Sequence, residues 1–487
     1  MPEKRPPKNM LFIMSDEHNA DFMGCAGHSQ VQTPTLDRLA ARGTLFDSAY
    51  TNCPICVPAR ASFATGRYVH DCGYWDNADP YDGKVQGWGH RLQAQGHKVI
   101  SIGKLHYRST DDANGFDEEI IPLNVVDGIG DLIGLIRDDT PERKAVRNMA
   151  ADVGRGESTY TGYDRDIAAE AARWLQEHGR TQDKPWCLFV SFVCPHFPLI
   201  APEEFYDLYD ESTVEMPQLY DMAERPDHPY YQAFKTVMAY DKYFDEATVR
   251  RAIVAYMGMI SFLDANIAQV LSALDAADLT DETRVIYTSD HGEALGKRGF
   301  WGKSTMFEES ARIPLIMAGP DIAQGQRVAT PVTLVDSHPT ILACVGAKPD
   351  AADSELPGRS LFDIADKEHD DRVAFSEYHA AGSSTANYMI RKGRYKLVAF
   401  VGMPSQLFDL EADPDETTDL AGDPTHAETV ALLEAELRLI CDPEAVDRQA
   451  RADQQTTIEK HGGREAILSR GDFGYSPAPG QTASFSS

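Results

Sequence analysis

Short apolar segments rich in β-branched residues alternate with stretches of helical periodicity along most of this chain. Such alternation is typical of a mostly parallel sheet with helices packed on both of its faces. We therefore predict an α/β fold. The expected strands are residues 9–15, 98–102, 186–193, 284–288 and 313–318; the expected helices include 34–41, capped by Thr33, and 248–274.

Length and charge narrow the class of protein. A chain of 487 residues, 42% of them hydrophobic, can form one large domain with a smaller companion. Its 76 acidic residues outnumber the 46 lysines and arginines, which gives a formal net charge of -30. This charge repels nucleic acids and anionic membrane surfaces, so we expect neither as a partner. An anionic substrate would need a site that supplies its own positive charge.

The N-terminal residues and the cysteines predict a cytoplasmic protein. Residues 1–8 lead directly into the first apolar run, without the hydrophobic stretch and small-residue cleavage site of an export signal. We find no uninterrupted apolar segment long enough for a membrane span. The 8 cysteines are scattered through the chain, a distribution typical of reduced thiols.

Polar side chains follow four of the expected strands. In open parallel sheets, ligands bind beyond the carboxyl ends of the strands. A single aspartate or histidine there is more often a cap, a turn or a surface residue, so the argument rests on the coincidence at four strands. The residues concerned are Asp16, Glu17, His18, Lys104, His106, His196, Asp290 and His291.

These residue types suit a bound cation and an oxyanion. Aspartate oxygens and neutral imidazole nitrogens are ligands for a divalent metal. Lys104, His106 and His196 could then bind an oxyanion and transfer protons. The competing interpretations are a helix cap for Asp16 and a turn residue for Asp290.

The most specific motif is CxPxRxxxxTG at residues 56–66. Pro58 predicts the start of a helix, and the positive field at a helix N-terminus stabilises an anion. Cys56 is therefore a candidate thiolate nucleophile, and Arg60, one turn later, could point the same way. A rival interpretation takes Cys53 and Cys56 as a CxxC dithiol redox centre.

The motif resembles the signature of the formylglycine-dependent sulfatases, a family of the alkaline phosphatase superfamily, near its choline sulfatase and phosphonate monoester hydrolase branches. The similarity continues through residues 33–43, 289–292, 313–315, 394–397 and 407–416. It implies three parts: a catalytic domain over residues 1–365, a small α+β domain with a short antiparallel sheet over 366–445, and a C-terminal extension over 446–487.

The resemblance also implies a metal site. In this family a maturation enzyme oxidises the signature cysteine to formylglycine, which becomes a metal ligand. Ca²⁺ is the metal implied, with Mn²⁺ or Zn²⁺ as alternatives. Glu17 departs from the family, where Gln or Asp is common, and adds a carboxyl group at or near the metal. The implied ligands are Asp16, the modified Cys56, Asp290 and His291, with Glu17 as a fifth candidate.

The remaining site residues are carried over by their positions in matching motifs. Arg60 resembles the arginine that holds the formylglycine hydrate. Asn77 matches an asparagine that contacts the anion, and Trp75 and Tyr74 beside it are candidate substrate-binding residues. The groups that flank the sulfate and the leaving group are Lys104, His106, His196 and Lys303.

The implied activity is that of a sulfuric ester hydrolase of the sulfatase or arylsulfatase type. The metal-bound formylglycine hydrate attacks the sulfur of a small sulfate ester and forms a covalent sulfo-enzyme hemiacetal. The departing alcohol takes a proton from Lys303 or His196, and His106 then deprotonates the second hydroxyl so that sulfate leaves. Lys104 offsets the charge on the sulfate oxygens.

Two other functions use the same residues. A phosphonate monoester or phosphodiester hydrolase would employ the same nucleophile, because sulfate and phosphonate monoesters carry the same single negative charge. A metal-binding relative without catalysis is disfavoured, because no candidate position is lost.

Two further segments carry predictions of their own. Residues 205–244 are rich in aromatic side chains, which either rim a pocket for an apolar or cationic alcohol or, as we expect for most of them, pack between the two domains. Residues 446–487 are too poor in apolar residues to form a core, and we expect them to contact a neighbouring subunit of a homodimer or homotetramer.

Overall fold

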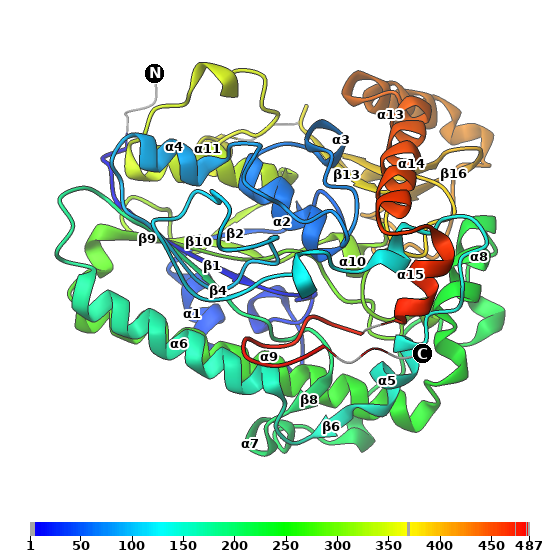
Figure 1. Cartoon of the computed structure of the whole chain (residues 1–487), viewed down its shortest axis with the longest axis horizontal. Coiled ribbons are helices and arrows are strands. Elements are labelled where there is room, and N and C mark those ends of the chain that lie inside the picture. The colour runs from blue at the N-terminus through cyan, green and yellow to red at the C-terminus, as the bar shows by residue number, and fades with distance from the viewer. Residues whose placement is uncertain (1–4, 368–370, 473, 484, 486–487) are drawn as a thin grey trace.

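A sheet of eight strands lies at the centre of the molecule, between two layers of helices (Figure 1). The computed structural model describes residues 5–367, 371–472, 474–483 and 485. Neighbouring strands run parallel except at β10, which is antiparallel to both of its neighbours. In spatial order the strands are β11 (Gln326–Val328), β2 (Gly43–Phe46), β10 (Leu315–Ala318), β9 (Thr283–Ser289), β1 (Asn9–Ser15), β7 (Cys187–Ser191), β4 (Val99–Lys104) and β5 (Glu118–Leu123). This architecture confirms the predicted α/β class.

Helices cover both faces of this sheet. The helices α6 (Thr159–His178) and α9 (Glu246–Ala276) pack together on one face, and α2 (Cys56–Thr65), α4 (Trp88–Ala94) and α11 (Ser337–Val345) lie on the other (Figure 1). The two faces bury alternate residues of each central strand, because successive side chains of a strand point to opposite sides. A strand buried on both faces therefore reads as a continuous apolar run.

Strand β1 illustrates this double burial. Leu11 and Ile13 belong to the hydrophobic core that includes α6 and α9. Phe12 belongs to the core on the other face, where its ring centroid lies 4.9 Å from that of Phe63 in α2. All of β1 is buried, which is why the segment could be recognised from its sequence.

Helix α9 forms much of the core with 31 residues. It begins after Asp245, whose side chain accepts a hydrogen bond from the Thr248 amide at 2.8 Å. Among the described residues it is the one helix long and apolar enough to cross a membrane, and 83% of its most apolar window is buried inside the molecule. The expectation that no segment has this length is therefore wrong for α9, which the structure uses as a core helix.

Two elements have the bounds expected from the sequence, and two other expectations differ from the structure. Strand β1 and helix α1 (Pro34–Ala41) have the expected bounds. Strand β10 begins two residues late, after Pro314, which has no amide hydrogen for the ladder. The predicted cap by Thr33 is wrong: its hydroxyl donates to Asp37 at 3.0 Å instead of capping the helix backbone.

The C-terminal part contains the predicted antiparallel sheet. Leu433 and Leu437 of α13 (Ala427–Ile440) are buried against this sheet. Its core is not separate from the rest, because Met389 and Val398 share one hydrophobic cluster with the catalytic part. The boundaries at 365 and 445 therefore stay a prediction. The strands, in order, are β13 (Val373–Tyr378), β14 (Asn387–Lys392), β15 (Tyr395–Phe400) and β16 (Met403–Asp409).

The C-terminal extension packs on the catalytic part of its own chain. It contains most of α14 (Pro443–Lys460) and all of α15 (Arg464–Arg470), and beyond α15 the chain returns toward the centre of the molecule (Figure 1). Ile458 and Ile467 are buried against Leu132 and Ile136. The expected contact with a neighbouring subunit concerns a second chain and stays a prediction.

The smaller elements complete the fold. They are β3 (Ala49–Tyr50), paired with β12 (Val332–Thr333); β6 (Val153–Arg155), paired with β8 (Leu199–Ala201); and the helices α3 (Val69–Cys72), α5 (Ala145–Ala151), α7 (Glu203–Tyr206), α8 (Pro229–Met238), α10 (Glu308–Ala311) and α12 (Leu361–Asp366).

A buried glutamate joins the C-terminal sheet to helix α3. Glu377 of β13 accepts hydrogen bonds from His70 Nδ1 at 2.8 Å and from His379 Nε2 at 3.0 Å. Burial opposes ionisation of Glu377, but His70 and the hydrogen bonds lower its pKa to about 2. Burial likewise opposes protonation of His70, but Glu377 raises the pKa of His70 to about 9. The two side chains therefore form a charged pair across a wide pH range.

We expect this pair to stabilise the protein most between about pH 4.5 and 6.5. The pKa of Glu377 is 4.5 in the unfolded chain and about 2 in the folded protein. Its contribution to stability is therefore lost as the pH falls from 4.5 through 2. The pKa of His70 is 6.5 in the unfolded chain and about 9 in the folded protein. Its contribution to stability is therefore lost as the pH rises from 6.5 through 9. We measure the free energy of unfolding of wild type and of Glu377→Gln in urea at a series of pH values. The difference between the two proteins should be largest between about pH 4.5 and 6.5. Exposed Glu428→Gln is the control, and a difference that does not vary with pH would contradict the assignment.

Candidate active site

The carboxyl ends of β9, β1, β7 and β4 lie side by side, because these strands are parallel neighbours. Asp290 follows β9, Asp16 follows β1, and Lys104 ends β4. Helix α2 begins with Cys56, whose Sγ lies 3.7 Å from Asp16 Oδ1. The structure thus brings the strand-end side chains together with the signature cysteine.

Four side chains at this edge could hold one metal ion. Their ligand atoms lie within 4.8 Å of one another, and all four residues are buried. His291 Nδ1 donates to the Gly292 carbonyl at 3.0 Å, so a neutral ring keeps its lone pair on Nε2, 3.1 Å from the Cys56 sulfur. Two carboxylates and an imidazole beside the Cys56 side chain fit a divalent cation. The four residues are Asp16, Cys56, Asp290 and His291.

Arg60 connects the two aspartates beneath Cys56. Its Nε donates to Asp290 at 2.8 Å, and its Nη2 donates to Asp16 at 3.1 Å. Its Nη1 donates to the Lys104 carbonyl and the Ser191 hydroxyl. Burial opposes the charge on Arg60, but the two carboxylates raise its pKa. Arg60 is thus a fixed cation that positions the carboxylates.

Lys104 adds a second buried cation. Its Nζ forms an ion pair with Asp16 Oδ2, and both side chains are almost fully inaccessible to solvent. Burial opposes ionisation of Asp16, but Lys104 and Arg60 hold its pKa well below the usual range. The carboxylate of Asp16 therefore stays ionised and available as a metal ligand.

The Cys56 thiol is a poor nucleophile in this environment. Burial, followed by the negative charge of Asp16, raises its pKa to about 12. The prediction of a thiolate from the helix N-terminus is therefore wrong, because the helix field competes with burial and a carboxylate. The neighbouring Cys53 is also buried, and burial raises its pKa well above the usual value. Neither sulfur has the exposed, low-pKa character of a redox dithiol.

Lys303 and His196 face Cys56 from the other side. Lys303 Nζ lies 3.3 Å from the Cys56 sulfur and 2.8 Å from His196 Nε2. His196 Nδ1 donates to the Phe197 carbonyl at 2.6 Å, so Nε2 carries the lone pair that accepts from Lys303. Burial, then the charge of Lys303, lowers the pKa of His196 well below its usual value. The pair thus combines an ammonium with a neutral imidazole.

Glu17 lies beside this pair and not within the four-residue cluster. Its Oε2 is 3.1 Å from Lys303 Nζ and 3.3 Å from His196 Nε2. With Asp16 and His196 it forms a second group of potential ligands. Burial raises the pKa of Glu17 to about 8, and its Oε1 has no hydrogen-bond partner among the described residues. The fifth predicted ligand therefore lies on the Lys303 side of the site.

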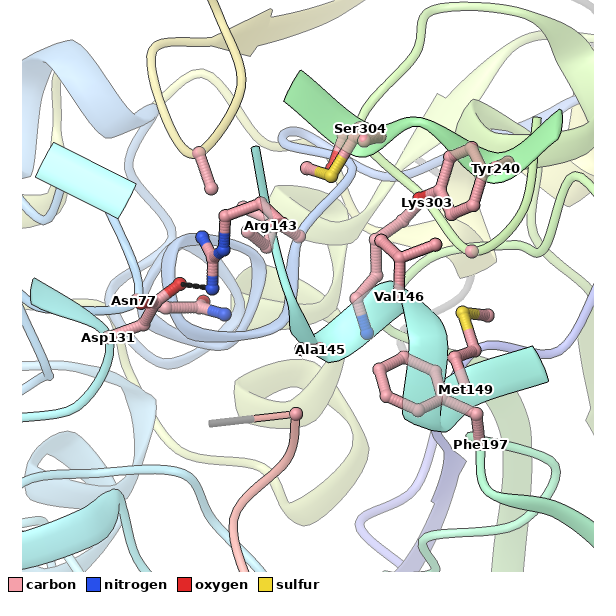
Figure 2. A pocket seen from close by; sticks show the side chains of 15 residues that line it. Asn77, Asp131, Arg143, Ala145, Val146, Met149, Phe197, Tyr240, Lys303 and Ser304 are labelled. Carbon is pink, nitrogen blue, oxygen red and sulfur yellow. Dashed lines mark hydrogen bonds and ion pairs between the residues drawn. The ribbon is translucent and has the colours of Figure 1, made fainter. Parts of the chain in front are cut away.

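Two pockets that share Asn77, Arg143 and Lys303 as lining residues form a cavity beside Cys56. Lys104, His106 and His196 line its inner part. In its outer part, Figure 2 shows Lys303 among apolar side chains, with Arg143 at the opposite side. Asn77 lines both parts, and its Oδ1 accepts from the Val57 amide at 3.1 Å. The apolar lining includes Ile55, Val146, Met149, Phe197, Met238 and Tyr240.

Trp75 and Tyr74 do not reach this cavity. The Trp75 indole donates to Asp453 of α14 at 2.9 Å, and the Tyr74 hydroxyl donates to Asp82 at 2.9 Å. Both residues are buried, and neither is among the described residues that line the cavity. The structure therefore corrects their predicted substrate contact, because neighbours of Asn77 in sequence need not share its direction.

Most aromatic residues of 205–244 also pack inside the protein. Tyr230, Tyr231 and Phe234 are fully buried in the main core. Tyr240 is the exception that lines the cavity (Figure 2). The expectation that packing explains most of these residues agrees with their placement. His18 is likewise internal, since it hydrogen-bonds the Tyr287 hydroxyl and the Phe22 carbonyl.

Sequence reasoning missed several residues at the cavity. Arg143 donates to Asp131 at 2.9 Å and to Asp472 at 2.7 Å (Figure 2 shows the first contact). Ser476, from the C-terminal extension, lies 2.8 Å from His106 Nε2. No local motif or periodicity marks these residues, because Asp472 lies 329 positions from Arg143 and His106 lies 370 positions from Ser476.

Comparison with known proteins decides the family. Residues 8–347 match the sulfatase family, and residues 296–442 match the C-terminal region of N-sulphoglucosamine sulphohydrolase. The chain belongs to the sulfatase family. This sulfatase is 32% identical to the choline-sulfatase of Rhizobium meliloti, over 92% of this chain and 89% of that protein. It is 30% identical to arylsulfatase K of Canis lupus familiaris, over 85% of this chain and 79% of that one.

Solved structures show the same fold. The phosphonate monoester hydrolase of Agrobacterium radiobacter aligns with a TM-score of 0.71 at 24% identity, over 91% of this chain and 96% of that one. The large mostly parallel sheet and the small antiparallel sheet are thus the alkaline phosphatase-like sulfatase fold. Together with the family match, the relatives identify this sulfatase as a sulfuric ester hydrolase.

Proposed function

We propose that this sulfatase hydrolyses sulfate monoesters with a nucleophile derived from Cys56 by oxidation to formylglycine. One observation carries the proposal: Cys56 lies at the inner end of the cavity, between the Asp16–Asp290–His291 cluster and Lys303. The thiol itself is protonated in this environment, so a chemical change is needed before it can attack. We assign that change to a maturation enzyme that recognises residues 56–66.

Different side chains of this chain would then hold a cation and bind the sulfate. The ligand cluster Asp16, Asp290, His291 and the modified Cys56 would hold a divalent cation, Ca²⁺ first and Mn²⁺ or Zn²⁺ as alternatives. When bound, the cation supplies positive charge that favours an ionised oxygen on residue 56 and attracts the sulfate. Arg60 fixes the aspartates in place, and Lys104 presents its ammonium to the sulfate oxygens.

Proton transfer uses the histidines and Lys303. Burial opposes the charge of Lys303, but the acidic groups around it, Glu17 and Asp16 among them, raise its pKa, so Lys303 is present as an ammonium that can protonate the departing alkoxide. His196 Nε2 accepts from Lys303 and orients that ammonium. His106, whose pKa is held well below its usual value by burial and by Lys104, is neutral and can take the proton of the second hydroxyl of residue 56. Sulfate then leaves and the aldehyde is restored.

The second candidate is a phosphonate monoester or phosphodiester hydrolase. It is supported by the three cations Arg60, Lys104 and Lys303, which suit any singly charged ester, and by a phosphonate monoester hydrolase from Silicibacter pomeroyi at 25% identity and a TM-score of 0.70 over 88% of this chain and 94% of that one. The apolar outer cavity suits an aryl or a small alkyl alcohol in either case.

A matched kinetic comparison tests the choice. We expect kcat/KM for an aryl sulfate to exceed that for a phosphonate monoester with the same leaving group by about tenfold or more, which corresponds to about 1.4 kcal/mol in the barrier. The protein must carry the aldehyde at residue 56, verified by peptide mass. Choline O-sulfate is measured alongside, because the Rhizobium meliloti relative is a choline-sulfatase. A preference for the phosphonate would move the enzyme to the other branch.

A further inference from the structure

The segment after helix α15 forms one wall of the active-site cavity. Beyond Arg470 the chain leads back toward the centre of the molecule (Figure 1). Gly474, Tyr475 and Ser476 line the cavity together with Cys56, Lys104 and His106. Both family matches end before this segment, at residues 347 and 442. The wall is therefore a feature of this chain that the family assignment does not explain.

Buried polar contacts fix this wall in place. Asp472 accepts from Arg143 Nη2 at 2.7 Å and from the Ala145 amide at 3.0 Å. The Ser476 carbonyl accepts from the Tyr160 hydroxyl at 2.5 Å. Asp472 and Ser476 are almost fully buried. Two separate anchors, four residues apart, thus determine where the Ser476 side chain lies.

The Ser476 hydroxyl contacts one nitrogen of His106 and leaves the other available. Its Oγ lies 2.8 Å from His106 Nε2. His106 Nδ1 is buried and has no hydrogen-bond partner among the described residues. A neutral imidazole carries one hydrogen and one lone pair, and the hydrogen bond made by one nitrogen decides the state of the other.

We propose that Ser476 is a positioning residue for His106: its Oγ accepts the Nε2 hydrogen and thereby keeps the lone pair on Nδ1. This inference rests on the proposed function, in which His106 accepts a proton. No bond is made or broken by Ser476, since it only selects the tautomer and orientation of the ring. A base that lacks its orienting partner holds the wrong tautomer for part of the time.

The burial of His106 makes the tautomer decisive. Burial and the nearby charge of Lys104 hold the pKa of His106 low, so the ring is neutral. With two neutral forms available, one exposes a lone pair at Nδ1 and the other exposes a hydrogen there. Only the first can accept a proton at that nitrogen. The Ser476 hydroxyl can accept from Nε2–H or donate to a bare Nε2. The second arrangement would bury an Nδ1 hydrogen that has no acceptor among the described residues, so the first form is favoured.

Three variants test the proposal in the full-length protein. Ser476→Ala should lower kcat by about tenfold to a hundredfold with little change in KM, the scale seen when an orienting partner is lost. Ser476→Thr keeps the hydroxyl and should restore most of kcat. Ser469→Ala removes an exposed hydroxyl of the same extension that donates to the Ala466 carbonyl, and it should retain wild-type kcat. Thermal unfolding of each variant checks that the fold is kept.

A second readout does not require activity. Nitrogen-15 NMR of the histidine rings, recorded on the unmodified protein and assigned with His106→Gln, reports which nitrogen carries the hydrogen. We expect the Nε2–H form in wild type and in Ser476→Thr, and a mixture of forms in Ser476→Ala. Hydrogen on Nδ1 in wild type, or full kcat in Ser476→Ala, would overturn the proposal.

The two hypotheses can fail separately. If the aldehyde-bearing wild type hydrolyses no sulfate ester, the proposed function fails, while the ring spectrum still shows whether Ser476 sets the tautomer. If wild type is active and Ser476→Ala lowers kcat without any change in the His106 spectrum, the positioning role is wrong and the enzyme's function stands.

Discussion

Replacing Cys56 by alanine is expected to lower kcat/KM for sulfate esters by about 10⁴-fold or more, the scale on which loss of a nucleophile acts. The metal cluster and the cations would remain, but no atom at position 56 could attack sulfur. The fold should persist, because the change removes one sulfur at the start of α2 and alters the free energy of unfolding by only about 1 kcal/mol. Steady-state kinetics and urea unfolding of the same preparation measure both effects.

Cys53→Ala is the matched control for this experiment. Cys53 is buried, three positions away, and belongs to the CxxC pair of the redox alternative. We expect Cys53→Ala to keep sulfate hydrolysis and the aldehyde at position 56, as read from the peptide mass. Equal loss of activity in both variants, together with a Cys53–Cys56 disulfide in wild type, would favour the dithiol hypothesis instead.

The fold could be predicted where burial alone decides the local structure. Strand β1 is buried on both faces, so its bounds follow from its apolar run. Helix α9 begins at Glu246, two residues before its expected start, because the Asp245 side chain caps it, a local signal that apolar periodicity alone does not reveal. Strand β10 looks like the parallel strands of the sheet in sequence, but it runs antiparallel to both of its neighbours, since strand direction depends on the path of the connecting chain.

The active site was predictable where residues follow strands, and not where distant segments meet. Asp16, Lys104 and Asp290 come together because their strands are parallel neighbours. Trp75 is close to Asn77 in sequence, but its indole donates a hydrogen bond to Asp453 on α14. Ser476 is separated from His106 by 370 positions, and such a contact leaves no local pattern to read. Sequence spacing thus locates residues within one motif and says little about side chains that return from elsewhere.

The site also shows how an acidic chain can bind an anion. Arg60 and Lys104 are almost fully buried, and each is held by a carboxylate that also belongs to the candidate metal cluster. Their charges are screened weakly inside the protein, whereas most of the excess acidic residues are at the solvated surface. The local field at the cavity can therefore be positive although the formal net charge is -30.

Loss of Arg60 should have the second largest effect, and it should appear in stability as well as in activity. Asp16 and Asp290 have no solvent exposure, and Arg60 pairs with both. Removing one member of a buried ion pair leaves an uncompensated charge, which costs about 3–5 kcal/mol. We therefore expect Arg60→Met to lower the free energy of unfolding of the metal-free protein by that amount, and to reduce kcat through displaced ligands.

A divalent cation should recover part of this loss. A ligand that binds only the folded state stabilises it by about 2.7 kcal/mol at a concentration of 100 times its Kd. Urea unfolding of Arg60→Met with Ca²⁺ and with a chelator measures this recovery. Arg165→Met is the control, because Arg165 forms an exposed pair with Glu157, and such pairs contribute about 1 kcal/mol or less.

The comparison of the two arginine variants distinguishes two states of the cluster. If Asp16 and Asp290 stay ionised, Arg60→Met is much less stable than Arg165→Met in the absence of metal. Ca²⁺ then reduces the difference in the free energy of unfolding between the two variants. If the variant loses no more stability than the control, one aspartate has taken up a proton in place of the guanidinium, and Arg60 then acts by holding that carboxylate in its ionised, metal-binding form.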